Sequence, residues 1–223
     1  MLNWKTFFNL DAFEHKDLFS EKGFVWEALD NIESYLSLLV LGTIEVEICH
    51  FVTLVNPDQI AIDEGVVIES GVQIEGPCLI GKNSKICHGA SIRAYSIIGD
   101  GCVVGHASEI KGSILLDGAK APHFNYVGDS ILGSNVNLGA GVICANVRLD
   151  EKPIEIRIGQ QKIPTNRIKL GAILADQVQI GCQCVINPGT LLGPGYSSKA
   201  LESIHGVFLP KEPSFHEQFT LPE

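Results

Sequence analysis

Residues 62–98 read IDEGVVIESGVQIEGPCLIGKNSKICHGASIRAYSII and carry an aliphatic residue at every sixth position. The same series runs on to Leu116 and returns later in the chain; its further members are Val104, Ile110, Leu116, Leu132, Leu138, Ile168, Leu174, Ile180, Ile186 and Leu192. A period of six matches neither an amphipathic helix nor a simple alternating strand. It fits short strands joined by tight turns, three of which close a triangular coil of about eighteen residues. The stretch therefore predicts an all-β solenoid, a parallel β-helix with its aliphatic side chains stacked inside.

Glycine directly follows several of these aliphatic residues, as in Ile80-Gly81, Ile98-Gly99 and Ile180-Gly181. A residue without a Cβ lets the backbone turn where a larger side chain would clash. The glycines are therefore expected at the corners of the coil.

The rhythm fails at KAPHFNYVGD, residues 120–129, because Leu116 and Leu132 are not separated by a multiple of six. We expect the coil to bulge outward here and to present Lys120, His123 and Tyr126. A second irregular stretch, residues 148–167, predicts a hairpin that turns near Gly159-Gln160. This excursion is either a decorated loop or a lid that reaches toward a neighbouring subunit.

The two ends of the chain lack the rhythm. Apolar residues at helical spacing predict one amphipathic helix at about residues 23–39, after a Phe-rich start. A solenoid must cover its terminal coil, so residues 1–50 are expected to form a short helical cap. Residues 51–200 are then the β-helix domain, and residues 201–223 an extended arm.

Composition excludes several classes of protein. The net charge of −10 argues against a nucleic-acid partner, because phosphate backbones require a basic face. The seven cysteines show neither a disulfide framework nor a zinc spacing, which indicates buried reduced thiols and no metal site. No window is long and apolar enough for a membrane span, and the start carries acidic residues where a secretory signal would be apolar. We expect a soluble cytoplasmic protein.

The six-residue repeat resembles the hexapeptide-repeat acyltransferases. That resemblance implies a left-handed coil and a homotrimer. Over residues 60–195 the chain looks most like the acetyltransferase domain of bifunctional sugar-1-phosphate enzymes, with its most specific portion at residues 108–152 and an archaeal-type stretch at residues 162–174. The resemblance implies N-acetylation of glucosamine-1-phosphate, or of a close relative, with acetyl-coenzyme A and without any metal.

The resemblance also implies roles for individual residues. His123 matches the catalytic base. Four residues match the substrate-binding set, namely Arg93 and Lys111 for the sugar phosphate, Tyr126 beside them and Asn137 on the sugar. The expected acetyl-coenzyme A contacts are Asn146, Ala140, Lys152, Arg167 and Lys169. The remaining histidines are interpreted as surface or core residues.

The sequence departs from the family pattern in two places: the pocket for the acyl donor, and the uridylyltransferase half of the bifunctional enzymes. Val147 stands where the family has an aromatic residue directly after the asparagine. No glycine-rich nucleotide loop precedes the repeats, so the chain is expected to acetylate and not to uridylylate.

Elementary chemistry supports a site of this kind. An amino sugar is largely an ammonium at neutral pH, and a histidine near its ordinary pKa is suited to removing that proton. The Gly139-Ala140-Gly141 turn offers backbone N–H groups for the oxygen of the thioester adduct. Arg93 and Lys111 are one full coil apart, so the period itself predicts that they project from the same edge of adjacent coils.

Two other functions remain open from the sequence. One is a long-chain acyltransferase of the lipid A type that acts on a UDP-sugar, which would need an apolar groove. The other is a non-catalytic β-helix that serves as an assembly subunit, which would have a damaged site.

Overall fold

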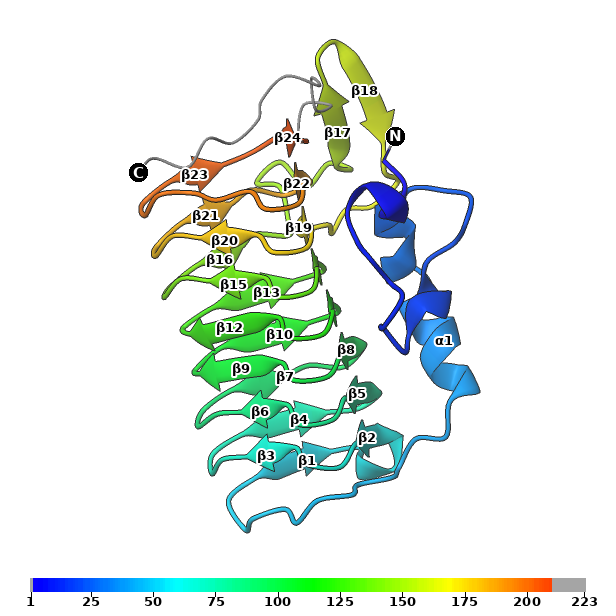
Figure 1. Ribbon diagram of the computed structural model, residues 1–223, viewed down its shortest axis with the longest axis vertical. Helices are drawn as coiled ribbons and strands as arrows, with labels where there is room; N and C mark the ends of the chain where they lie inside the picture. The colour runs from blue at the N-terminus through cyan, green and yellow to red at the C-terminus, as the bar shows by residue number, and fades with distance from the viewer. Residues whose placement is uncertain (1, 210–223) are drawn as a thin grey trace, which may run out of the picture.

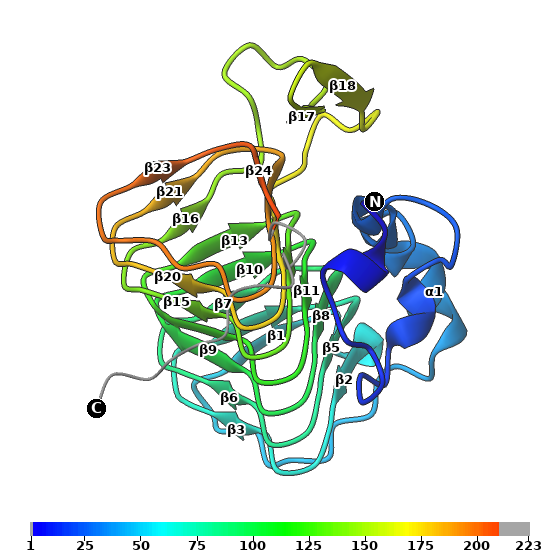
Figure 2. The same cartoon turned by 45° about the horizontal axis from the view of Figure 1, so that its top comes forward.

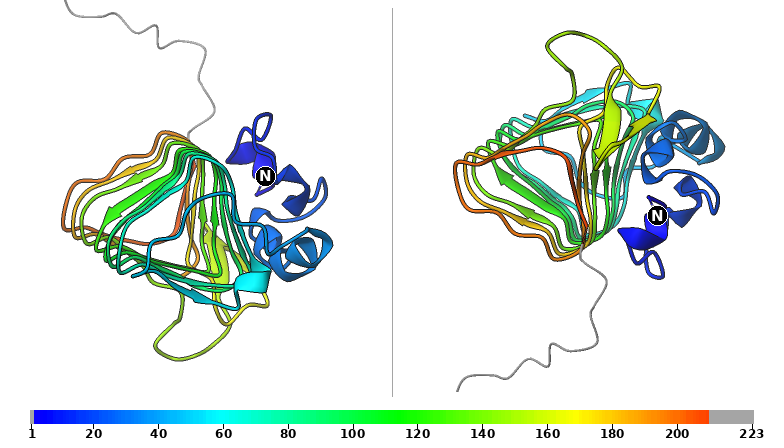
Figure 3. Two further views of the ribbon diagram at one scale, coloured as in Figure 1. Left: turned by 90° about the horizontal axis from the view of Figure 1, so that it is seen from below. Right: turned by 90° about the horizontal axis from the view of Figure 1, so that it is seen from above.

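Figure 1 presents the computed structural model, which describes residues 2–209; its main body is a stack of β-helical coils. Three parallel sheets form the sides of a triangular prism, and the coil is left-handed (Figures 2 and 3). Sheet A contains β2 (Ile60–Ile62), β5 (Cys78–Ile80), β8 (Ser96–Ile98), β11 (Ile114–Leu115), β14 (Ile131–Leu132), β19 (Ala172–Leu174), β22 (Thr190–Leu192) and β24 (Val207–Phe208).

The other two sides complete each coil. Sheet B contains β1 (Thr53–Val55), β4 (Gln73–Glu75), β7 (Ser91–Ile92), β10 (Glu109–Lys111), β13 (Tyr126–Gly128), β16 (Ile143–Cys144), β21 (Val185–Ile186) and β23 (Ser203–Ile204). Sheet C contains β3 (Val67–Ile68), β6 (Lys85–Ile86), β9 (Val103–His106), β12 (Lys120–His123), β15 (Asn137–Leu138) and β20 (Gln179–Ile180). The chain passes from sheet B to sheet A and then to sheet C in every regular coil.

The predicted inward stacking is confirmed by the strand register. Ile62 pairs with Ile80, and Ile80 pairs with Ile98, one coil apart in sheet A. These three side chains have no exposed surface. Burial of such an aliphatic column is the main stabilising contribution, at roughly 1.5–3 kcal/mol for each side chain.

The expected bulge at residues 120–129 is wrong. Ala121 pairs with Val104 and Val127 pairs with Ile110, and both are fully buried, so the inward rhythm continues through the stretch. The spacing is short at two places: Leu115, which pairs with Ile98, follows Ile110 by five positions, and Leu132, which pairs with Leu115, follows Val127 by five. One residue is missing from the corner after β10, where Gly112 has a φ of 54°, and one from the corner after β13, where Asp129 has a φ of 45°. The stretch is therefore a regular part of the coil that runs from one shortened corner to the next.

The predicted hairpin is confirmed. β17 (Glu155–Ile158) and β18 (Gln161–Pro164) pair antiparallel around Gly159-Gln160. The excursion leaves the solenoid at the corner between sheets B and A, where the Leu170 N–H donates to the Asn146 carbonyl. Ile154 and Ile156 are buried, and Ile154 lies beside Gly189 of the solenoid. The hairpin is thus anchored to the prism and projects from it (Figure 2).

The N-terminal segment contains four short elements, η1 (Trp4–Thr6), η2 (Lys16–Leu18), η3 (Val25–Leu29) and α1 (Ile32–Leu38). The single helix expected at residues 23–39 is therefore divided into η3 and α1. The segment lies along the side of the prism against sheet A, not over its end (Figures 1 and 3). Sheet A explains this position, because its outward residues are apolar as well as its inward ones, and Ile97, Ile131 and Ile173 would otherwise face water.

The C-terminal boundary also differs from the expected one. β23 and β24 pair with β21 and β22, so the solenoid continues to Phe208. An arm was expected from residue 201, and its remainder, residues 210–223, lies outside the described residues. Within residues 2–209, no helix has the length and apolar character needed to cross a membrane.

Candidate active site

His123 lies at the corner between sheets C and B, at the end of β12, and its side chain is exposed. It is aligned with His106 of the coil below, and His106 stacks on His88 with 5.6 Å between ring centroids. The Nδ1 atoms of these two lower histidines bond to backbone carbonyls, at 2.6 Å for His88 with Ser70 and 2.8 Å for His106 with His88. The corner therefore carries a column of three imidazoles, of which the uppermost is the predicted base.

Ala140 lies directly above His123 in this column. The Gly141 N–H donates to the His123 carbonyl at 2.9 Å, and the Gly139 N–H donates to the Ile180 carbonyl at 2.7 Å. The Ala140 N–H has no hydrogen-bond partner among residues 2–209. Of the three N–H groups in the predicted turn, this one is free to donate to a bound oxygen.

The predicted phosphate cations lie at the opposite edge of sheet B. Arg93 directly follows β7 and Lys111 ends β10, and these two strands are adjacent, as the period predicts. Both line a cleft of about 320 Å³ that also contains Tyr95, Asp129 and Arg167. Arg167, which was expected at the coenzyme, thus lies beside the two predicted phosphate cations.

Carboxylates accompany these cations. The Arg93 guanidinium pairs with Glu75 at 3.1 Å and with Glu109 at 3.2 Å. Lys111 Nζ lies 3.1 Å from Asp129 Oδ2, and Arg167 pairs with Asp30 of the N-terminal segment. An incoming phosphate must therefore compete with carboxylates for these cations.

Tyr126 connects the two edges of sheet B. It begins β13, three residues after His123, while its hydroxyl lies beside Asn146 near Gly128. Asn146 Nδ2 donates to Asp129, the partner of Lys111. Burial raises the pKa of Tyr126, against an opposing effect of Lys111, so the phenol stays protonated and able to donate a hydrogen bond.

The predicted residues therefore form two groups in a single chain. His123 and Ala140 share the corner between sheets C and B, whereas Arg93, Lys111, Tyr126, Asn146 and Arg167 gather toward the corner between sheets B and A. Asn137 lies on sheet C between Lys120 and Gln179, away from both groups. Lys152 is exposed on the excursion, and Lys169 is exposed directly after it. The sequence analysis missed Asp129 and Tyr95, although Tyr95 lies two residues after Arg93 and Asp129 directly follows β13, which begins with Tyr126.

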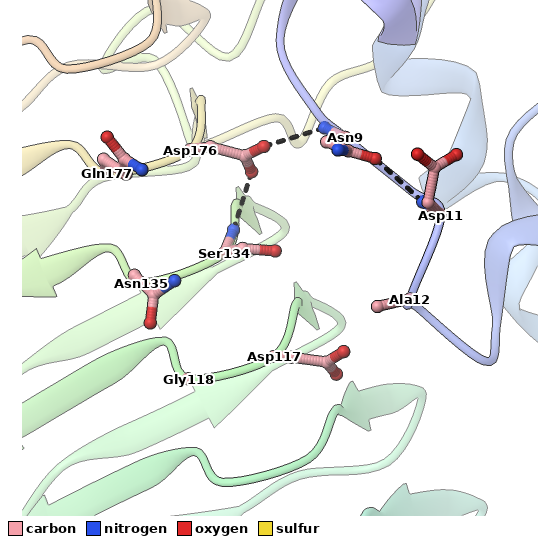
Figure 4. A pocket seen from close by; sticks show the side chains of 9 residues that line it. All are labelled: Asn9, Asp11, Ala12, Asp117, Gly118, Ser134, Asn135, Asp176 and Gln177. Carbon is pink, nitrogen blue, oxygen red and sulfur yellow. Dashed lines mark hydrogen bonds between the residues drawn. The ribbon is translucent and has the colours of Figure 1, made fainter.

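Another cleft lies between the N-terminal segment and the corner from sheet A to sheet C (Figure 4). The Asp176 carboxylate in this cleft accepts hydrogen bonds from two backbone N–H groups, that of Asn9 at 2.7 Å and that of Ser134 at 2.8 Å. Burial raises the pKa of both Asp176 and Asp117. The side chains that line this cleft include no cation that could bind a phosphate, so it is not the candidate active site.

Neither a reactive buried thiol nor a metal site is found among the described residues. Burial raises the pKa of Cys78, Cys102 and Cys144 to about 12, which makes these thiols inert. The described part of the chain contains no group of His, Cys, Asp and Glu side chains that could hold a metal ion.

Residues 74–194 match a family model described as the GMPPB C-terminal domain. The chain is 35% identical to the "Bifunctional protein GlmU" of Methanococcus maripaludis, over 82% of its own length and 44% of the relative's. It is 36% identical to the "Putative uncharacterized acetyltransferase YaiX" of Escherichia coli, over 70% of its own length and 75% of the relative's.

Among solved structures, PerB from Caulobacter crescentus in complex with CoA and GDP-perosamine is 16% identical, with a TM-score of 0.36, over 70% of this chain and 54% of that one. The chain spans only 25% and 44% of the length of two curated relatives named GlmU.

Proposed function

Because the chain belongs to the hexapeptide-repeat acyltransferases, we propose that it transfers an acetyl group from acetyl-coenzyme A to the amine of an amino-sugar 1-phosphate, with glucosamine-1-phosphate as the first choice. The product is the N-acetylhexosamine 1-phosphate. The observation that carries this proposal is the meeting of Arg93, Lys111 and Arg167 in one cleft.

In the proposed reaction His123 removes a proton from the substrate ammonium. The neutral nitrogen then attacks the thioester carbonyl carbon. As the C–S bond breaks, the nitrogen of the adduct loses its second proton, which the leaving thiolate takes up, so that coenzyme A leaves as a thiol. The amine is a competent nucleophile once neutral, so no covalent enzyme intermediate is required. The exposed position of His123 suits a base that must exchange its proton with solvent after each turnover.

The negative charge that develops on the thioester oxygen requires a donor. The free Ala140 N–H lies one coil above His123 and is the group we assign to this task. A backbone donor is already oriented before the reaction, so it stabilises the adduct without reorganisation.

The phosphate of the acceptor is assigned to the cleft at the other edge of sheet B. Arg93, Lys111 and Arg167 supply charged donors, and the carboxylates of Glu75, Glu109 and Asp129 hold two of these cations in place until a phosphate arrives. The same carboxylates are available to accept hydrogen bonds from sugar hydroxyls or from the ammonium.

The donor is proposed to contact Asn146, Lys152 and Lys169, of which the two lysines are exposed and able to meet phosphates of coenzyme A. We also propose a homotrimer, in which a neighbouring copy would complete a site whose two groups lie at opposite edges of sheet B. Light scattering on the purified protein measures the mass of the assembly and so tests the homotrimer directly.

The decisive experiment mixes the purified chain with acetyl-coenzyme A and glucosamine-1-phosphate and follows the release of free thiol. Release that depends on the amino sugar supports the proposal. No release with any hexosamine phosphate, together with no binding of coenzyme A, would leave a non-catalytic assembly subunit. Release only with a UDP-sugar and a long-chain acyl donor would establish the alternative acyltransferase.

A further inference from the structure

Tyr95 has a backbone conformation that large side chains avoid. Its φ is 61°, and among residues 2–209 the only other aromatic residue with a positive φ is Phe124, beside His123. Most other corners of this kind are occupied by glycine, asparagine, aspartate or glutamine. A bulky residue held in the left-handed region is a genuine outlier, and such outliers gather at functional sites.

Two clefts share Tyr95 as a wall. The first is the cationic cleft of about 320 Å³ that contains Arg93, Lys111 and Arg167. The second has a volume of about 420 Å³, and its lining mixes apolar residues (Leu36, Leu39, Leu41 and Pro77) with polar ones (Glu33, Ser37, Asp58 and Gln59). A residue that lines both clefts lies between them, and the Tyr95 N–H is fixed to the Pro77 carbonyl at 2.6 Å.

The N-terminal segment supplies the facing walls of both clefts. Leu29 and Ile32 line the cationic cleft and are 6% and 2% exposed, so they are held firmly. Asp30 pairs with Arg167, which ties this wall to the excursion. The segment precedes residue 74, where the family match begins, and therefore adds a feature to the site that the matched repeats do not contain.

We propose that Tyr95, backed by the N-terminal segment, ends the acceptor pocket beyond the phosphate. A sugar monophosphate held by Arg93 and Lys111 fits a cleft at the small end of the usual range for ligand sites. A nucleoside diphosphate sugar carries a second phosphate, a ribose and a base, which would have to pass Tyr95 to reach the second cleft. Tyr95 thus restricts the acceptor to sugar monophosphates. This inference rests on the proposed function.

The experiment compares kcat/KM for glucosamine-1-phosphate with that for the matching UDP-amino sugar. Tyr95→Gly and Tyr95→Asn remove the ring with residues that tolerate a positive φ, and Tyr95→Phe keeps the ring as a matched control. We expect both ring-free variants to raise the relative use of the UDP-sugar by about 10-fold or more, the size of a single pocket contact. Tyr95→Phe should keep the wild-type ratio.

Equal use of both acceptors by the wild-type protein, or an unchanged ratio in both ring-free variants, overturns the inference while leaving the proposed function intact. The absence of activity on either acceptor overturns the proposed function itself. Thermal unfolding of each variant separates a changed pocket from a loss of fold. If one ring-free variant fails to fold, the ratio of the two kcat/KM values measured on the other variant tests the inference.

Discussion

Lys111 and Asp129 form a partly buried ion pair between adjacent coils, with 3.1 Å between Nζ and Oδ2. The two side chains are 26% and 13% exposed, and Asn146 donates to the same carboxylate oxygen. A lysine held by one carboxylate is oriented before any ligand binds, which reduces the entropy lost when a phosphate takes over.

Replacement of this lysine tests the phosphate assignment. Lys111→Met should raise the KM for the sugar phosphate by about 10- to 100-fold, because a hydrogen bond from a charged group contributes roughly 1.5–3 kcal/mol. Steady-state kinetics measures the change. Lys85→Met is the control, since Lys85 pairs with Glu69 at 2.9 Å on sheet C and should leave the KM unaltered. Equal effects of both substitutions would argue against the assignment.

The histidine column provides its own control for the catalytic base. His123→Ala should lower kcat by about 100- to 10,000-fold, the usual contribution of a positioned base. His106→Ala, one coil below, should change kcat less than about 3-fold, because a surface substitution away from the chemistry has small effects. Thiol release under saturating substrate measures both. A fully active His123→Ala variant would remove the residue from the mechanism.

Replacement of two glycines by alanine is expected to have different effects: one on substrate binding and one on stability. A Cβ on Gly128 would lie 2.7 Å from the Tyr126 hydroxyl and 2.8 Å from Asn146 Nδ2, so Gly128→Ala should displace both side chains and weaken acceptor binding. A Cβ on Gly105 would overlap the Pro122 carbonyl oxygen, so Gly105→Ala should destabilise the whole fold. Thermal unfolding and kinetics on the two variants separate these outcomes. An unaltered KM for the sugar phosphate in Gly128→Ala would show that Tyr126 does not serve the acceptor.

The free energy of unfolding should fall as the pH drops through the range in which His15 becomes protonated. This residue is 6% exposed, its Nδ1 lies 3.0 Å from the Tyr35 hydroxyl, and burial lowers its pKa below 6.5. The unfolded chain then binds the proton more readily, so the free energy of unfolding decreases as pH falls below about 6.5, by at most about 1.4 kcal/mol per pH unit for one group. Above that value the contribution is fully present.

Urea unfolding of the wild type and of His15→Phe at pH values of about 7.5 and 5.5 measures this effect. The facing acids Glu14, Asp63, Asp100 and Asp117 oppose the shift, which makes the expected slope smaller than the limit. His15→Phe should show a shallower dependence on pH. An identical slope in the variant would place the pH sensitivity elsewhere.

Thiol labelling should divide the seven cysteines by burial. Cys49 and Cys182 are exposed, Cys87 is half-buried, and the other four are buried. A maleimide at neutral pH should modify the two exposed thiols quickly, Cys87 slowly, and the remainder only after unfolding, since the thiolate is the reactive form. Peptide mass spectrometry over time identifies the sites. Rapid labelling of Cys78 or Cys102 would contradict the packed interior.

The parts of the site that were predictable depend on the period. The alignment of Arg93 with Lys111 follows from their separation by one coil, and the register of β7 and β10 confirms it. The bulge at residues 120–129 was mispredicted because two corners are each one residue short, so the inward residue is Leu115 and not Leu116, and Leu132 follows Val127 by five positions. A one-residue deletion at a corner leaves little trace in the sequence, since Leu116 is also aliphatic and also fully buried.

By itself, the sequence determined the coil: a residue recurring every six positions must face inward once per side, and the apolar identity of that residue makes the β-helix the stable solution. Only the tertiary structure decided the placement of the N-terminal segment, the pairing of Arg93 with Glu75 and Glu109, and the position of Tyr95 between two clefts. These relations join residues from different coils or from outside the repeat. Side-chain packing sets such contacts, and a periodic pattern does not encode them.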